Sequence, residues 1–178
     1  LSPCSIYSKM KFIGSEKCDK NTSTSTTANF GPGFDCLGAS LGLYNYIEMG
    51  FSDEPIVEVR GEGKEEIPTD ETNLVYQAGL KVLELAGVDK HLKIVLENNI
   101  PIARGLGSSA ACIVGGLKAA NRLVGDAFDN IELIRIATQM EGHPDNVVPA
   151  TFGGFCLSMI HENRIIYKTF PMPFWLQF

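Results

Sequence analysis

Residues 101–111 read P-I-A-R-G-L-G-S-S-A-A, a run of glycines and small side chains that is typical of a phosphate-binding loop. The run follows an alternating apolar stretch that predicts a strand, and it precedes a periodic apolar stretch that predicts a helix. The first turn of a helix presents unpaired N–H groups and the positive end of the helix dipole to an anion. Gly105 and Gly107 lack a Cβ atom, so the backbone can approach that anion closely. The segment predicts a site for the phosphates of ATP.

Two hydroxyl groups follow the second glycine of this loop. Ser108 and Ser109 can either cap the helix or ligate a Mg²⁺ ion that is bound to the phosphates. No lysine follows Gly107, so the loop is not a Walker A sequence, and it does not match G-x-G-x-x-G. For a bare G-x-G-S-S sequence, an ordinary connection between a strand and a helix is the alternative interpretation.

A glycine-rich segment at residues 29–42, N-F-G-P-G-F-D-C-L-G-A-S-L-G, does not favour a regular element and predicts a loop. It contains an amide, Asn29, and a carboxylate, Asp35, on a backbone with little side-chain cover. Such a pair suits recognition of a small polar ligand. The alternative is a turn in which both side chains bond only the local backbone.

A third segment, residues 141–150, reads E-G-H-P-D-N-V-V-P-A. Glu141 ends a predicted helix, where the negative end of the dipole is unfavourable for a carboxylate. A bound Mg²⁺ ion would reverse the sign of that interaction. A lone histidine such as His143 is more often structural than functional, so a ligand role for it depends on its surroundings.

These residues need a scaffold of mixed elements. Alternation and β-branched content predict strands at residues 43–51, 56–60, 92–100, 153–159 and 164–170. Apolar periodicity and capping residues predict helices at residues 72–86, 108–124, 130–141 and 145–150. Residues 20–27 fit a loop or a ragged strand. Because strands and helices mix without strict alternation, we expect an α+β fold.

Composition excludes several classes of protein. The 178 residues carry a net charge of -6 and show no basic patch, which argues against nucleic-acid binding. The five cysteines include no C-x-x-C pair, which argues against a zinc ribbon or a disulfide framework. No apolar run reaches the roughly 18 residues that a membrane span needs. We therefore expect a cytoplasmic protein that does not bind membranes.

Taken together, the three segments resemble the motifs of the GHMP kinases, and within that superfamily those of the homoserine kinases. Residues 26–38 are similar to T-S-A-N-L-G-P-G-F-D-x-L-G, residues 101–111 to the second motif of the superfamily, and residues 141–150 to E-G-H-P-D-N-V-A-P-A. The resemblance implies the GHMP-kinase N-terminal domain, a ribosomal protein S5 domain 2-like fold. It also implies ATP and Mg²⁺ as cofactors, and transfer of the γ-phosphate to L-homoserine in threonine biosynthesis.

The resemblance assigns roles to individual residues. Asn29, Asp35 and His143 would bind homoserine, and Glu141 would hold Mg²⁺ together with Ser109 or, less favoured, Ser108. Asn146 stands where several GHMP kinases have an aspartate that acts as a base. An asparagine cannot take the proton, so catalysis would depend on positioning and charge neutralisation. The residues expected at ATP are Pro101, Ile102, Ala103, Arg104, Gly105, Leu106, Gly107, Ser108, Ser109, Ala110, Ala111 and Asn73.

Asn73 has a second interpretation as a helix cap, which is compatible with contact to the adenine base.

For the domains, we expect an atypical segment at 1–25, an ATP-binding domain at 26–170 and the start of a truncated C-terminal domain at 171–178. With the ferredoxin-like C-terminal domain largely missing, we expect little or no turnover from this chain alone. The resemblance is compatible with a homodimer at full length. The alternatives to a homoserine kinase are another GHMP kinase with a different alcohol substrate and a truncated, non-catalytic fragment.

Overall fold

The computed structural model describes residues 19–162 and 164–171. Most of the atypical segment at 1–25 and of the segment at 171–178 lies outside these residues. The elements follow one another as β1 (Asp19–Ala28), β2 (Leu37–Ser52), β3 (Ile56–Gly61), α1 (Leu74–Ala86), β4 (His91–Asn98), α2 (Ser108–Leu123), α3 (Asn130–Glu141), α4 (Pro144–Phe152), β5 (Phe155–His161) and β6 (Arg164–Phe170). The mixture confirms the expected α+β class.

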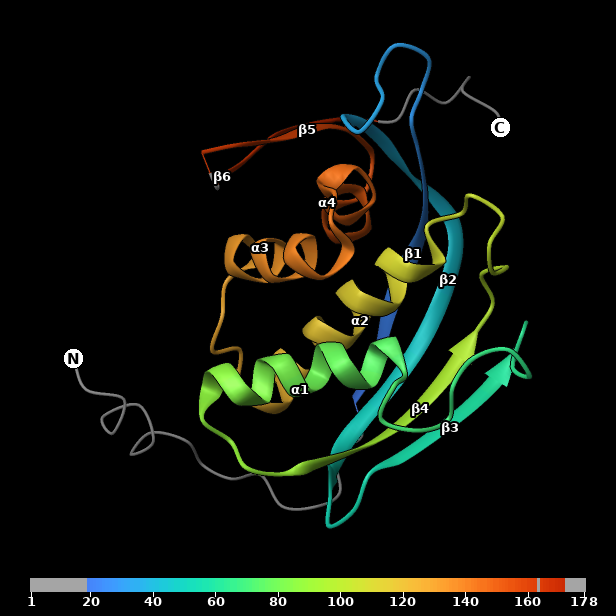
Figure 1. The fold of residues 1–178 in the computed structure, drawn as a ribbon, viewed down its shortest axis with the longest axis vertical. Helices are drawn as coiled ribbons and strands as arrows, with labels where there is room; N and C mark the ends of the chain where they lie inside the picture. Colours follow the sequence, from blue (N-terminus) through green and yellow to red (C-terminus); the bar gives the residue numbers. More distant parts are fainter. Residues whose placement is uncertain (1–18, 163, 172–178) are drawn as a thin grey trace, which may run out of the picture.

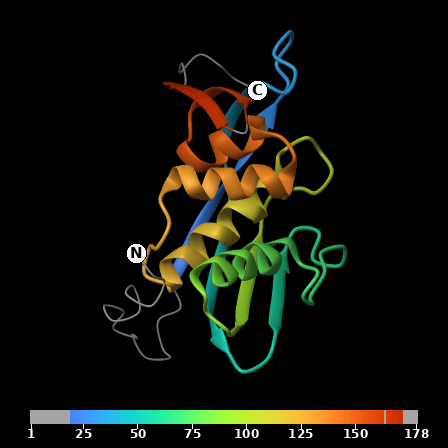
Figure 2. The same cartoon turned by 60° about the vertical axis from the view of Figure 1, so that its left-hand side comes forward.

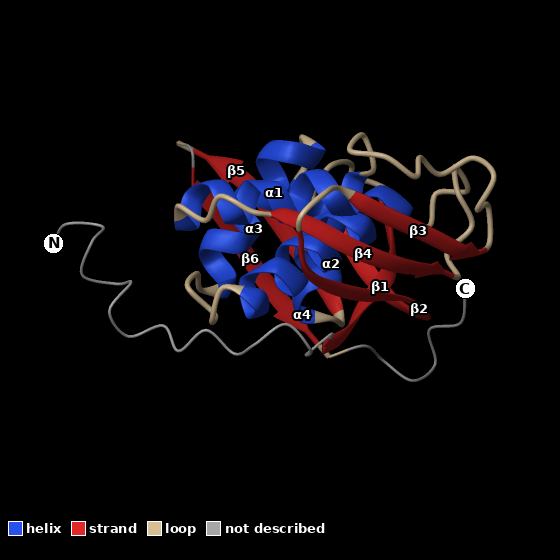
Figure 3. Ribbon diagram, turned by 90° about the horizontal axis from the view of Figure 1, so that it is seen from below, coloured by secondary structure: helices blue, strands red, loops and turns tan. Residues whose placement is uncertain are grey.

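The strands form one sheet whose centre is the long strand β2 (Figure 1). The order is β3-β4-β2-β5-β6. Strand β1 lies off this path and pairs with β2. Neighbours are antiparallel except β3 and β4, which are parallel and are joined through α1. Seen from below, β5 and β6 lie at the opposite end of the helical layer from β3 (Figure 3). Figure 1 shows that the sheet curves around the helical layer.

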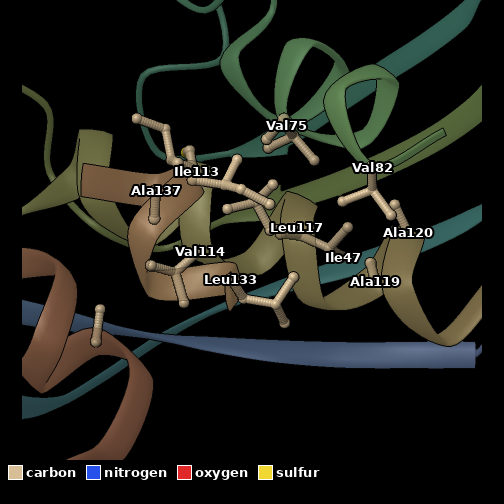
Figure 4. Close-up of a cluster of buried hydrophobic side chains, with 14 of the residues drawn as sticks. Ile47, Val75, Val82, Ile113, Val114, Leu117, Ala119, Ala120, Leu133 and Ala137 are labelled. Carbon is tan, nitrogen blue, oxygen red and sulfur yellow. The ribbon is translucent and has the colours of Figure 1, made fainter. Parts of the chain in front are cut away.

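Helix α2 occupies the middle of the helical layer, between α1 and α3 (Figures 1 and 2). Small residues on α2 allow its neighbours to approach closely. A Cβ atom on Gly116 would lie 2.6 Å from the carbonyl oxygen of Val75 in α1, and a Cβ atom on Gly115 would lie 2.5 Å from Cδ1 of Ile47 in β2. This packing, part of the core in Figure 4, fixes the position of the α2 N-terminus relative to the sheet.

The helix boundaries follow the predicted capping signals. Asp129 caps α3 in a capping box with Glu132, and the left-handed Gly87 ends α1. The expected helix at 130–141 is confirmed with the same bounds. The expected helix at 145–150 is longer, because Pro144 begins it and Pro149 lies within it without ending it.

One expectation is wrong. Residues 37–42, expected to be part of a glycine-rich loop, are the first residues of β2. Gly38 pairs with Ala28 of β1 and Cys156 of β5, and a Cβ atom there would overlap the carbonyl oxygen of Asp145. The glycine therefore serves close packing of a strand against α4. Of the two interpretations of residues 20–27, the ragged strand is confirmed, with an irregularity between Thr24 and Thr26.

Candidate active site

The phosphate loop joins the end of β4 to the start of α2. Gly107 is the N-cap of α2 with φ of 61°, and no side chain caps the helix. The first N–H groups of the helix therefore remain available to an anion. Ser108 and Ser109 were expected either to cap the helix or to ligate Mg²⁺, and capping is not observed.

Strand β1 holds this loop in place. The N–H of Thr26 donates to the carbonyl oxygen of Leu106 at 3.1 Å, and the hydroxyl of Ser25 donates to the same oxygen at 2.8 Å. A Cβ atom on Gly107 would overlap Oγ1 of Thr26. The glycine therefore provides both the left-handed backbone conformation and the space for this contact.

A cavity of about 390 Å³ lies between the phosphate loop and the segment that connects β3 to α1. Its volume is within the usual range for a small-molecule site. Exposed Arg104 adds a cation to the lining. Of the residues expected at ATP, Ala110 and Ala111 do not line the cavity and are fully buried. The lining residues are Glu66, Ile67, Pro68, Thr72, Asn73, Leu74, residues 101–109 and Cys112.

Asn73 lies in the wall of this cavity and also caps α1. Its Oδ1 accepts a hydrogen bond from the N–H of Val75 at 2.9 Å, and its Nδ2 donates to the carbonyl oxygen of Pro68 at 2.7 Å. The side chain is almost fully buried. The cap interpretation is therefore observed, and contact with the adenine base stays a prediction.

Ser109 and Glu141 meet where the N-terminus of α2 approaches the C-terminus of α3. The hydroxyl of Ser109 donates to Oε2 of Glu141 at 2.7 Å. The last turn of α3 has no basic residue, so no side chain of that turn offsets the helix dipole at this carboxylate. A hydroxyl and a carboxylate are oxygen ligands of the kind that Mg²⁺ accepts, and Mg²⁺ usually takes its other ligands from water and substrate phosphates. The two residues therefore fit such an ion.

Asn146, at the start of α4, lies near Gly107 of the phosphate loop. Its Oδ1 accepts a hydrogen bond from the hydroxyl of Thr26 at 2.8 Å, and it would lie 3.1 Å from a Cβ atom on Gly107. The third motif thus contacts both the first motif and the phosphate loop. Sequence reasoning assigned no role to Thr26, although its place as the first residue of the first motif was a usable signal.

Asn29, Asp35 and His143 form a separate group beside α4. Asn29 and Asp35 have φ of 64° and 55°, and the N–H of Asp35 donates to Oδ1 of Asn29 at 2.8 Å. Nδ1 of His143 lies 3.8 Å from Oδ2 of Asp35. Asn29 therefore makes the local turn contact, while Asp35 also faces a residue from a distant motif.

Asp145 is a buried carboxylate in the same group, and sequence reasoning gave it no role. Only 3% of its surface is exposed. Burial raises the pKa of this carboxyl, and the negative charge of Asp35 raises it further. A hydrogen bond from the N–H of Asn146 at 3.0 Å and the charge of His143 oppose that rise in pKa.

Within residues 19–162 and 164–171, no helix is both long and apolar enough to cross a bilayer. Nor does this part of the chain bring three or more histidine, cysteine, aspartate or glutamate side chains together as a metal cluster.

Comparison with known proteins identifies the family. A profile described as the GHMP kinases N terminal domain matches residues 73–154. Homoserine kinases of Carboxydothermus hydrogenoformans and Desulfitobacterium hafniense are 48% and 46% identical, over 83% and 81% of this chain and 49% of each relative. The chain thus spans about half the length of the curated relatives it matches.

A solved structure agrees with the sequence matches. The crystal structure of homoserine kinase from Cytophaga hutchinsonii superposes with a TM-score of 0.75 and is 31% identical, covering 92% of this chain and 55% of that one. Both comparisons confirm the predicted fold and the similarity to homoserine kinases. The described residues form the N-terminal domain of a GHMP kinase, and the chain belongs to that superfamily.

Proposed function

We propose that this chain is the ATP-binding part of a homoserine kinase, which transfers the γ-phosphate of ATP to the hydroxyl of L-homoserine in the cytoplasm, as a step of threonine biosynthesis. In this proposal residues 26–170 form the nucleotide-binding domain. The observation that carries it is the 2.7 Å contact between Ser109 and Glu141 at the N-terminus of α2. It supports a cation site directly beside the helix end that can receive phosphates.

The nucleotide would lie in the cavity between residues 66–74 and the phosphate loop. The N–H groups of α2 would bind its phosphates, and Arg104 at the cavity edge would add positive charge. A Mg²⁺ ion held by Ser109 and Glu141 would supply charge neutralisation on the phosphates. The hydrogen-bonded Glu141 carboxylate is already oriented toward Ser109, so little reorganisation is needed.

The acceptor would lie at the group formed by Asn29, Asp35 and His143. Asp35 supplies a carboxylate that can bind an amino group, and His143 supplies a donor that can bind a carboxylate. Asn146 cannot take a proton from the acceptor hydroxyl, but Thr26 holds its side chain in one orientation. Asn146 would therefore position the hydroxyl for in-line attack, which is sufficient for a loose phosphoryl-transfer transition state.

A domain graft tests the reaction. The matching half of the Carboxydothermus hydrogenoformans homoserine kinase is replaced by this chain, and ADP release is measured with Mg·ATP and L-homoserine, mevalonate or galactose. We expect turnover with L-homoserine only. Turnover with another alcohol and not with homoserine would show that the substrate is wrong.

Nucleotide binding by the 178-residue chain itself is measured separately by calorimetry. We expect binding of Mg·ATP that Glu141→Gln weakens. Absence of Mg·ATP binding to both the chain and the graft would contradict the assignment of the phosphate loop. The two assays thus separate an error in the acceptor from an error in the nucleotide site.

A further inference from the structure

Two buried asparagines, Asn45 in β2 and Asn98 at the end of β4, lie behind the nucleotide cavity. Both are fully inaccessible to solvent. Nδ2 of Asn45 donates to Oδ1 of Asn98 at 2.7 Å. Oδ1 of Asn45 accepts from the N–H groups of Asn99 at 2.8 Å and Ile100 at 3.2 Å. Asn45 therefore holds the backbone that leads directly into the phosphate loop.

Asn98 extends these contacts to the other wall of the cavity. Its Nδ2 donates to the carbonyl oxygens of Glu62 at 2.7 Å and Ile100 at 3.0 Å. Its main-chain oxygen accepts from the N–H of Glu62 at 2.7 Å. Glu62 precedes the segment that contributes Glu66, Ile67 and Pro68 to the lining. One side chain thus connects the two segments between which the cavity lies.

Burial constrains this geometry. A buried amide without partners costs free energy, so each N–H and oxygen must keep its partner. Each of the two side-chain amides has a partner for its Nδ2 donor and for its Oδ1 acceptor. Such satisfied networks are rigid. Neighbouring Cys112, which lines the cavity, lies with Sγ 3.9 Å from Nδ2 of Asn45. The pair therefore contacts the chain at the start of both segments that line the cavity. Asn45 also lies beside Cys112, another lining residue.

We propose that Asn45 and Asn98 are positioning residues for the nucleotide, which set the separation between the residue 62–68 segment and the phosphate loop. The inference rests on the proposed nucleotide site. Neither asparagine lines the cavity, so both act through the backbone that they hold.

Asn98→Asp tests the connection with almost no change in shape. The new carboxylate oxygen would face the carbonyl oxygens of Glu62 and Ile100, so two donated hydrogen bonds become contacts between acceptors. The bond from Asn45 to the other oxygen is retained. We expect the Kd for Mg·ATP to rise by about tenfold or more, because the two segments would no longer be held at the separation that the nucleotide needs. Asn45→Asp keeps the bonds from Asn99 and Ile100 and should raise the Kd less.

Two controls separate positioning from general loss of stability. Asn99→Ala removes a side chain that donates to the carbonyl oxygen of Tyr44 but keeps the main-chain N–H, and it should leave the Kd unchanged. Leu133→Ala in α3 destabilises the core away from the cavity. At temperatures where all variants are folded, it too should bind Mg·ATP normally. Amide exchange should increase at residues 62–68 and 99–107 in Asn98→Asp and not in Leu133→Ala.

The outcomes are distinct. Normal Mg·ATP affinity in folded Asn98→Asp would overturn the inference while the proposed function stands. If Asn98→Asp does not fold, Asn45→Asp takes its place, and an unchanged Kd in that variant would overturn the inference. Equal weakening in Leu133→Ala would also overturn it, because the effect would then follow stability alone. Failure of the unsubstituted chain to bind Mg·ATP would reject the proposed nucleotide site and this inference with it.

Discussion

The hydroxyl of Ser109 donates a 2.7 Å hydrogen bond to Oε2 of Glu141, although 32 positions separate the two residues in the chain. The contact joins the positive end of α2 to the negative end of α3. It places a carboxylate close to N–H groups that can bind phosphate. A cation between carboxylate and phosphate would satisfy both charges.

Removing this carboxylate should weaken binding of the metal-bound nucleotide specifically. In Glu141→Gln we expect the Kd for Mg·ATP to rise by about tenfold or more, while binding of ATP in excess EDTA changes little. Calorimetric titration with and without Mg²⁺ measures the difference. Glu84→Gln, which removes an exposed partner of Lys81, is the matched control and should behave like the unsubstituted chain. An equal loss with and without Mg²⁺ would argue against a metal role.

Gly107 should not tolerate a side chain. In Gly107→Ala, the Cβ atom would overlap Oγ1 of Thr26 in addition to the cost of a positive φ. Gly105→Ala has a similar φ of 70° but nothing within 4 Å of the Cβ atom, so it should lose only about 1–2 kcal/mol. Gly107→Ala should lose about 1–3 kcal/mol more. Urea unfolding of both variants measures the difference, and equal losses would refute the contact.

The hydroxyl of Thr26 should matter for turnover through its bond to Asn146. In the grafted kinase, Thr26→Val should lower kcat by about tenfold and leave the KM for ATP nearly unchanged, because the bond orients a group at the acceptor. Thr26→Ser keeps the hydroxyl and should restore most of the rate. A change in KM alone, or no recovery in Thr26→Ser, would contradict the role of the bond.

The buried carboxyl of Asp145 predicts a pH-dependent stability. Burial raises the pKa of Asp145 in the folded state above its ordinary value of 3.8. The contribution of this carboxyl to the free energy of unfolding is therefore complete below the pKa of the unfolded state. It is lost as the pH rises through the pKa of the folded state. Asp145→Asn cannot ionise, so its Tm should exceed that of the unsubstituted chain by a few degrees at pH 7.

The difference in Tm should shrink as the pH falls below the ordinary pKa of 3.8, because the carboxyl then becomes protonated in both states. Thermal unfolding between about pH 3.5 and 7.5 follows it. Asp126→Asn, at an exposed position, is the control and should show no such trend. A Tm difference that grows toward low pH would reverse the sign and refute the burial argument.

Local signals were sufficient for much of the fold. The capping box at Asp129 and the stop at Gly142 delimited α3, and Gly87 ended α1, because capping depends on residues within one turn of the chain. The phosphate loop was predictable for the same reason, since it is one contiguous strand-loop-helix segment. The similarity to homoserine kinases was also recoverable, because it depends on the order of three short motifs.

Contacts between segments were decided only by the tertiary structure. Residues 37–42 form a strand despite their glycines, because pairing with β1 and β5 and close packing of Gly38 on α4 outweigh local preference. The partner of Asn146 and the connection through Asn45 and Asn98 join residues distant in the chain. No local pattern specifies such pairs, since each depends on how the sheet and helices pack.

The amino-acid sequence by itself determined which residues could bind phosphate, a cation and a small polar acceptor. It did so because residue type and short spacing define that chemistry. The tertiary structure decided which of these residues meet. Ser109 meets Glu141, and Asp35 faces His143, because α2 and α4 pack against one sheet and α3 packs against both of these helices, with their ends gathered near the phosphate loop.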